Sequence, residues 1–127
     1  MFSHIMVGSN DLERSKRFYD ALFGAIEAAP GRQDDRGLNY LHNGALFMVR
    51  PPKDGQAATN GNGSTIGFSI DSPERVDAWH AAGVQEGGAS IEDPPGIRQG
   101  TFGPLYLAYL RDPDGNKLCG LHRVPTE

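Results

Sequence analysis

The sequence has one cysteine, no long apolar run and no excess of basic residues. A single cysteine cannot form an internal disulfide, which favours a reducing compartment such as the cytoplasm. No window is apolar over the length of a membrane span, and the first residues do not resemble a secretory signal, so no membrane partner is expected. The 12 Lys and Arg residues are outnumbered by 16 Asp and Glu residues. The resulting net charge of −4 argues against a nucleic-acid partner, because phosphate binding needs clustered basic residues.

The rest of the composition is that of a soluble globular protein. A chain of 127 residues with 38% hydrophobic and 22% charged residues suits one domain, or two half-size units that share a core. The 17 glycines and 9 prolines predict many turns. Two segments rich in these residues, 51–63 and 92–104, are predicted to be loops, although the second also carries Ile97, Arg98 and Phe102.

The chain contains an internal repeat, in which residues 3–22 align without a gap on residues 64–83. In the second copy Ile66, Phe68 and Ile70 alternate with small or polar residues, which predicts a strand with one apolar face. The first copy follows the same alternation, and both copies continue into an amphipathic helix. The expected caps are Asn10 or Asp11 for the first helix and Asp71 or Ser72 for the second, and the expected ends are Gly24 and Gly83.

Three further strands are predicted after each helix. They cover residues 26–29, 38–42 and 45–50 in the first copy and residues 86–90, 106–110 and 117–122 in the second. An Asn-Gly turn and a Pro-Asp-Gly turn join the last two strands of the respective copies. The sequence therefore predicts an α+β fold of two tandem βαβββ modules, residues 1–50 and 64–122, joined by the linker 51–63.

Two stretches of this repeat, "FSHIMVGSNDLERSKRFYDALFG" near the start and "AYLRDPDGNKL" near the end, resemble the vicinal oxygen chelate superfamily. This group includes glyoxalase I, bleomycin-resistance proteins, fosfomycin-resistance proteins and extradiol dioxygenases. The resemblance covers essentially the whole chain as a single glyoxalase-like domain, and the small glyoxalase-like proteins are the most similar. It implies two sheets that form a cup open on one side, a small-molecule ligand, a homodimer, and one divalent metal ion held by two ligands from each module.

The resemblance places the metal-ligand positions at His4, Met48, Thr65 and Cys119. Imidazole and carboxylate groups suit a divalent catalytic ion, so His4 is a suitable ligand, and Cys119 suits a softer ion such as zinc. A thioether and a hydroxyl are poor ligands for such ions, so Met48 and Thr65 are assigned to the substrate-contacting wall of the cup. If a metal ion binds, His4 and Cys119 are the implied ligands of an incomplete site.

Other roles stay open for these residues. His4 would serve as a catalytic base or ligand, or else be a buried, hydrogen-bonded histidine. Cys119 would be a ligand, a nucleophile or a small apolar filler, and the filler is favoured because no cation or helix start is evident beside it.

Two more residues are predicted to contact substrate. Arg98, in its glycine-rich segment, would clamp a carboxylate or phosphate, or else be an ordinary solvated arginine. Tyr106, like Tyr40 and Tyr109, is assigned to the cup lining or to a dimer interface.

Three functions compete. The first is a glyoxalase-like protein that binds a small molecule in its cup, as a lyase or isomerase similar to lactoylglutathione lyase, or as a dioxygenase relative, with a degenerate metal site. The second is a non-enzymatic binding or sequestering protein of the bleomycin-resistance type, which the atypical ligand positions favour. The third is a structural dimer without a ligand.

Overall fold

A computed structural model describes residues 1–126 of the chain, and it contains two α-helices and nine β-strands among them. In chain order the elements are β1 (Ile5–Gly8), α1 (Leu12–Gly24), β2 (Arg32–Gln33), β3 (Leu38–His42), β4 (Ala45–Arg50), β5 (Ile66–Ser69), α2 (Pro73–Gln85), β6 (Ala89–Ser90), β7 (Gly96–Gly100), β8 (Gly103–Arg111) and β9 (Lys117–Arg123).

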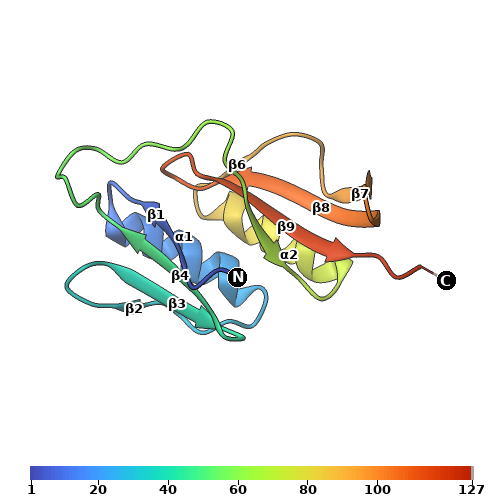
Figure 1. The fold of residues 1–127 in the computed structure, drawn as a ribbon, viewed down its shortest axis with the longest axis horizontal. Coiled ribbons are helices and arrows are strands. Elements are labelled where there is room, and N and C mark those ends of the chain that lie inside the picture. The colour runs from blue at the N-terminus through green and yellow to red at the C-terminus, as the bar shows by residue number, and fades with distance from the viewer. Residues whose placement is uncertain (127) are drawn as a thin grey trace.

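The strands form two mixed sheets, one from each half of the chain. The first has the order β1-β4-β3-β2, and the second has the order β5-β9-β8-β6 with β7 also paired to β8. In the first sheet β1 runs parallel to β4, and in the second sheet β5 runs parallel to β9. All other neighbouring strands are antiparallel. The sheets lie side by side, and both helices lie behind them (Figure 1). The predicted α+β fold of two βαβββ-like modules is therefore confirmed.

Both helices begin at the predicted caps. The Asp11 side chain accepts a hydrogen bond from the Arg14 amide at 3.1 Å. The Ser72 hydroxyl accepts one from the Arg75 amide at 3.2 Å, and Pro73 occupies the first helical turn, where its missing N–H costs nothing.

The helix ends agree with prediction in one case only. α1 ends at Gly24, whereas α2 runs on to Gln85, so the prediction that Gly83 stops it is wrong. Gly83 is instead a point of close packing, because a Cβ atom there would lie 2.6 Å from a methyl carbon of Leu110 and 3.0 Å from one of Leu22. The glycine is needed to bring α2 close to α1 and β8.

Two predicted segments also differ. Residues 26–29 form a turn and irregular backbone, not a strand, and their apolar side chains Ile26 and Ala28 pack against the core without strand pairing. The predicted loop 92–104 contains β7, which pairs with β8 along its whole length. Glycines at both ends of β7 and polar residues within it are typical of a loop, and only the pairing with a neighbouring strand reveals the edge strand.

One hydrophobic core joins both modules. Aromatic residues of α1, β4, β5 and α2 contact one another in a continuous chain that runs from Tyr19 through Phe47 and Phe68 to Trp79. Phe18, Tyr19, Leu22, Leu38, Val49, Val76, Trp79, Ala108, Leu110 and Leu118 are fully buried in it.

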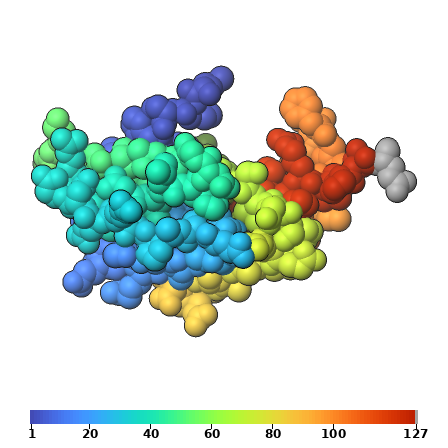
Figure 2. Space-filling view, turned by 90° about the horizontal axis from the view of Figure 1, so that it is seen from below, coloured from blue at the N-terminus to red at the C-terminus, as the bar shows by residue number. Residues whose placement is uncertain are grey.

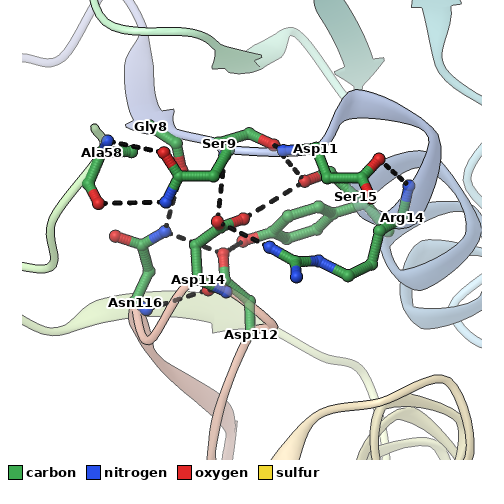
Figure 3. Close-up of polar contacts among 11 residues, drawn as sticks. Gly8, Ser9, Asp11, Arg14, Ser15, Ala58, Asp112, Asp114 and Asn116 are labelled. Carbon is green, nitrogen blue, oxygen red and sulfur yellow. Dashed lines mark hydrogen bonds and ion pairs between the residues drawn. The ribbon is translucent and has the colours of Figure 1, made fainter. Parts of the chain in front are cut away.

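The turn before β9 fastens the second module to the start of α1 (Figure 3). The Asp114 side chain is 2% exposed. One of its carboxylate oxygens accepts hydrogen bonds from the Asn10 amide at 3.0 Å and from the Arg14 guanidinium at 2.8 Å. The other accepts a longer bond from the Ser15 hydroxyl at 3.4 Å.

Asp112, in the same turn, holds the turn together and adds a hydrogen bond to α1. One oxygen accepts the amides of Asp114 and Asn116 at 2.9 Å each, and the other accepts the Tyr19 hydroxyl at 2.5 Å and the Asn116 amide group at 2.8 Å. Asn116 also donates to the Gly8 carbonyl at 3.3 Å. We call this network the inter-module clamp; it consists of Gly8, Asn10, Arg14, Ser15, Tyr19, Asp112, Asp114 and Asn116.

Candidate functional site

Each sheet has one face against the helices and one face that points away from them, which we call the open face. Along β8, Ala108 and Leu110 face the core, so Leu107 and Tyr109 point to the open face. On the first sheet the open face leaves Met6 55% exposed and Leu41 69% exposed. The N-terminal arm and the β7–β8 turn both project from the sheet side of the molecule (Figure 2). The open face is therefore the broad surface that a ligand or a second chain can reach.

Two of the four implied ligand positions belong to the first module. His4, just before β1, is exposed, and its Nδ1 is 2.7 Å from the Ser3 hydroxyl. Met48 lies on the open face of β4 but is buried, because Arg50 covers it and donates a hydrogen bond to its sulfur at 3.1 Å. Neither side chain offers a carboxylate.

The other two positions belong to the second module. Thr65 is exposed and immediately precedes β5. Cys119 on β9 pairs with Gly67 and with Tyr109, and it is 4% exposed. Burial raises the pKa of the Cys119 thiol, so the protonated form dominates at neutral pH. A buried, protonated thiol is a small apolar group and a poor nucleophile.

Polar side chains gather around Cys119 on the open face of the second sheet. The Lys117 ammonium forms an ion pair with Glu92 and lies 5.0 Å from the centre of the Tyr109 ring. Arg98, on β7, donates hydrogen bonds to the carbonyls of Asp93 at 3.0 Å and Pro94 at 2.9 Å. We call Glu92, Arg98, Tyr109, Lys117 and Cys119 the β8–β9 cluster.

Glu92 lies in the break between β6 and β7 and has a left-handed backbone, with φ of 59°. Such a conformation is uncommon for a residue other than glycine, and it persists where the surroundings impose it. The ion pair with Lys117 is the contact that holds this side chain over the sheet. Sequence reasoning missed Glu92 and Lys117, because nothing in the sequence indicates that they meet across β8.

The three tyrosines considered for the cup lie on different sides of the sheets. The Tyr106 hydroxyl donates to Asp77 of α2 at 2.8 Å, and this bond raises the pKa of Tyr106. Tyr40 is buried in the core and donates to Asp20 at 2.8 Å. Tyr109 is the member of the three that reaches the open face, whereas Tyr106 points toward α2.

A cavity of about 400 Å³ lies in the seam between the two sheets. Its walls are mainly apolar and come from both modules, with Ile5, Phe23 and Phe47 on one side and Ile66 and Phe68 on the other. Gly67 and Ser69, on the open-face side of β5, also line it. This volume matches a small organic molecule.

Residues 1–119 match the family model of the Glyoxalase/Bleomycin resistance protein/Dioxygenase superfamily. The chain belongs to this superfamily. It is 57% identical to a glyoxalase/bleomycin resistance protein of Albidiferax ferrireducens, whose crystal structure superposes with a TM-score of 0.95 over 97% of this chain and 99% of that one.

More distant superfamily structures share the fold. A glyoxalase-related enzyme of Fulvimarina pelagi is 22% identical with a TM-score of 0.74, over 97% of this chain and 88% of that one. A family enzyme of Burkholderia phytofirmans is 15% identical with a TM-score of 0.72, over 96% and 98% of the two chains. No helix within residues 1–126 of this superfamily member is long and apolar enough to cross a membrane.

The metal ion that the superfamily resemblance implies does not fit the side chains at these positions. An imidazole, a thioether, a hydroxyl and a protonated thiol are not the imidazole and carboxylate set that an oxygen-chelating ion prefers. Across residues 1–126, no three His, Cys, Asp or Glu side chains lie close enough together to hold a metal ion. Catalytic zinc sites use three protein ligands, and residues 1–126 of this superfamily member bring no such set together.

Proposed function

We propose that the protein binds a small organic molecule between its sheets, without the four-ligand metal site that the superfamily resemblance implies. The observation that carries this proposal is the ligand set itself, in which the implied positions hold His4, Met48, Thr65 and Cys119. The seam cavity supplies apolar volume for such a molecule. His42, Asn43 and Ser69 also line this cavity and supply polar groups that would orient the ligand.

A homodimer is part of this proposal. Met6, Leu41 and Phe102 are large apolar side chains that remain exposed on or beside the open face. Burying apolar surface yields about 25 cal/mol per Å², so a second copy that covers this face gains free energy and closes the cup. The ligand would then be enclosed between the two copies.

Metal analysis tests the first part of the proposal. Untagged protein, purified without chelator, is analysed for bound elements and then titrated with zinc, nickel, manganese and iron(II). We expect far less than one ion per chain and no difference between wild type and His4→Ala. Near-stoichiometric metal that is lost in His4→Ala would contradict the proposal.

Sedimentation analysis tests the dimer. Leu41→Asp places a charge on the open face and should shift the protein toward monomer. Val84→Asp is the matched control, because Val84 is also an exposed apolar residue but lies on α2, away from the open face. Equal dissociation in both variants, or a wild-type monomer at all concentrations, would exclude this interface.

A metal-independent lyase or isomerase is a second candidate function. Glu92 favours it, because a carboxylate paired with Lys117 near Tyr109 is placed to exchange a proton with a ligand on the open face. The hemithioacetal of methylglyoxal and glutathione is the first substrate to test. Turnover that survives chelation and is lost in Glu92→Gln but not in Asp93→Asn would favour the enzyme. Absence of turnover favours the binding protein.

A further inference from the structure

Four aromatic side chains in the wall of the seam cavity contact one another. Phe23 of α1 lies at their centre, with its ring centre 5.0 Å from that of Tyr40 and 5.5 Å from that of Phe47. The ring centre of Phe68, from the second module, lies 5.2 Å from that of Phe23. All three pairs meet edge to face, which is an arrangement that aromatic rings prefer. A flat aromatic ligand in the cavity would extend this cluster.

The cavity wall carries no fixed charge. Among the described residues that line it, none is Asp, Glu, Lys or Arg. The Tyr40 hydroxyl is already engaged, because it donates to Asp20 at 2.8 Å. A charged group that leaves water for such a wall finds no opposite charge to pair with, which is costly. The wall therefore favours an uncharged ligand.

The free edge of β5 faces this cavity. Among the strands within residues 1–126, β5 pairs with β9 alone. The Ile70 amide, just after β5, donates to the Leu121 carbonyl of β9 at 2.8 Å. Along a strand, the backbone N–H and C=O groups of successive residues point to opposite sides. Those of Gly67 and Ser69 therefore point away from β9, and both residues line the cavity.

Three side chains add hydrogen-bonding groups to the same wall. His42 and Asn43 come from the end of β3 and the turn that follows it, and Ser69 ends β5. An imidazole, a carboxamide and a hydroxyl supply both donors and acceptors. With the edge of β5, they form a polar rim on an apolar cavity. An amide group carries a donor and an acceptor side by side, so it complements the edge of a strand.

From these observations we infer that the seam cavity binds an uncharged aromatic amide. Its ring lies against Phe23, Phe47 and Phe68, and its amide group bonds to the free backbone edge of β5. The second contact is the small-molecule form of strand addition, in which main-chain groups supply the hydrogen bonds. This inference rests on the proposed ligand-binding function and names the chemical class of its ligand.

Calorimetric titration tests the ligand class. The probes are 2-naphthamide, the charged 2-naphthoate, and 2-acetylnaphthalene, which has the carbonyl acceptor but no N–H donor. We expect the amide to bind at least about ten-fold more tightly than either of the others, with an affinity that sodium chloride leaves unchanged. Equal or tighter binding of the carboxylate or the ketone, or no binding of the amide, would overturn the inference.

Backbone hydrogen exchange, followed by NMR, locates the amide contact. Saturation with 2-naphthamide should slow exchange at Gly67 or Ser69, whose N–H groups point to the cavity. Phe68 is the internal control, because its N–H points to β9 and its exchange should not change. Unchanged exchange at both Gly67 and Ser69 in the saturated protein would contradict the strand-edge contact.

A cavity-filling variant tests the place of the ligand. Ala45 is an exposed residue at the start of β4 that lines the cavity. Ala45→Trp should weaken binding of 2-naphthamide at least about ten-fold, because the indole takes up the space of the ligand. Ala81→Trp, at an exposed position of α2, is the matched control and should bind as the wild type does. Circular dichroism and thermal unfolding confirm that both variants are folded. Wild-type affinity in Ala45→Trp would refute the assignment.

The two proposals can fail separately. Binding of 2-naphthoate or 2-acetylnaphthalene in preference to the amide, by a protein that remains a metal-free dimer, defeats only the ligand class. Stoichiometric metal lost in His4→Ala, or a monomer at all concentrations, defeats the proposed function itself.

Discussion

The inter-module clamp and the open face are both rich in polar groups, but they differ in how those groups are satisfied. In the clamp, the carboxylates of Asp112 and Asp114 accept hydrogen bonds at every oxygen (Figure 3). The Nε donors of Arg14 in the clamp and of Arg50 on the open face are both buried without a partner, and Arg98 has no acidic partner within residues 1–126. The two regions therefore differ in their acceptors: the clamp holds two fully bonded carboxylates that stabilise the fold, whereas Arg50 and Arg98 on the open face have no carboxylate to pair with.

The sequence motif by which the superfamily is recognised is therefore distinct from the positions that would carry its metal chemistry. The Asp-Pro-Asp-Gly-Asn turn that carries the resemblance is a structural part, because its side chains tie β9 to α1. The positions that resemblance links to metal binding hold His4, Met48, Thr65 and Cys119 instead. The scaffold of the superfamily can therefore be kept while the site chemistry changes.

The largest expected effect breaks the clamp. Asp112→Ala removes four accepted hydrogen bonds and leaves the buried Tyr19 hydroxyl unpaired, which should lower the free energy of unfolding by about 3 kcal/mol. Urea denaturation measures this change. Asp35→Ala, at an exposed carboxylate, should change stability by less than about 0.5 kcal/mol. Equal stability of the two variants would show that the clamp carries no structural role.

A smaller effect is expected on the open face. Cys119→Ala deletes a buried sulfur and should cost about 1–2 kcal/mol, with the affinity for any ligand largely unchanged. Urea denaturation and ligand titration on the same variant separate the two quantities. Loss of ligand or metal binding at intact stability would show that Cys119 is a ligand and not a packing group.

The smallest effect concerns Asp20, whose carboxylate is well bonded but partly open to solvent. Burial acts to raise the pKa of Asp20, but hydrogen bonds from the Gly31 amide, Lys16 and Tyr40 outweigh it and lower the pKa. A lowered pKa in the folded state means that stability is present above the unfolded-state pKa and is lost as pH falls through the folded-state value.

Tyr40→Phe removes one of these bonds, so it should cost about 1 kcal/mol at neutral pH and reduce the loss of stability on acidification. Urea denaturation at pH 7 and at successively lower acidic pH values measures both changes. The same acid dependence in wild type and variant would mean that Tyr40 does not act through Asp20.

The sequence predicted the parts of the fold that depend on local chemistry. The capping side chains of Asp11 and Ser72 and the two turns before the last strands each have a local physical cause, and all were confirmed. β7 was missed because an edge strand flanked by glycines is recognised only by its pairing with β8.

The candidate site was less visible in the sequence because it depends on register. Arg98 and Cys119 were singled out from the sequence, but the ion pair of Glu92 with Lys117 crosses β8 and joins residues from separate segments. The unpaired Nε of Arg50 depends on how its side chain lies over Met48, which no local pattern indicates.

The most direct test of the account is elemental analysis of untagged protein purified without chelator, for wild type and His4→Ala side by side. The account predicts far less than one metal ion per chain in both proteins. Near-stoichiometric metal in the wild type that is lost in His4→Ala would contradict it.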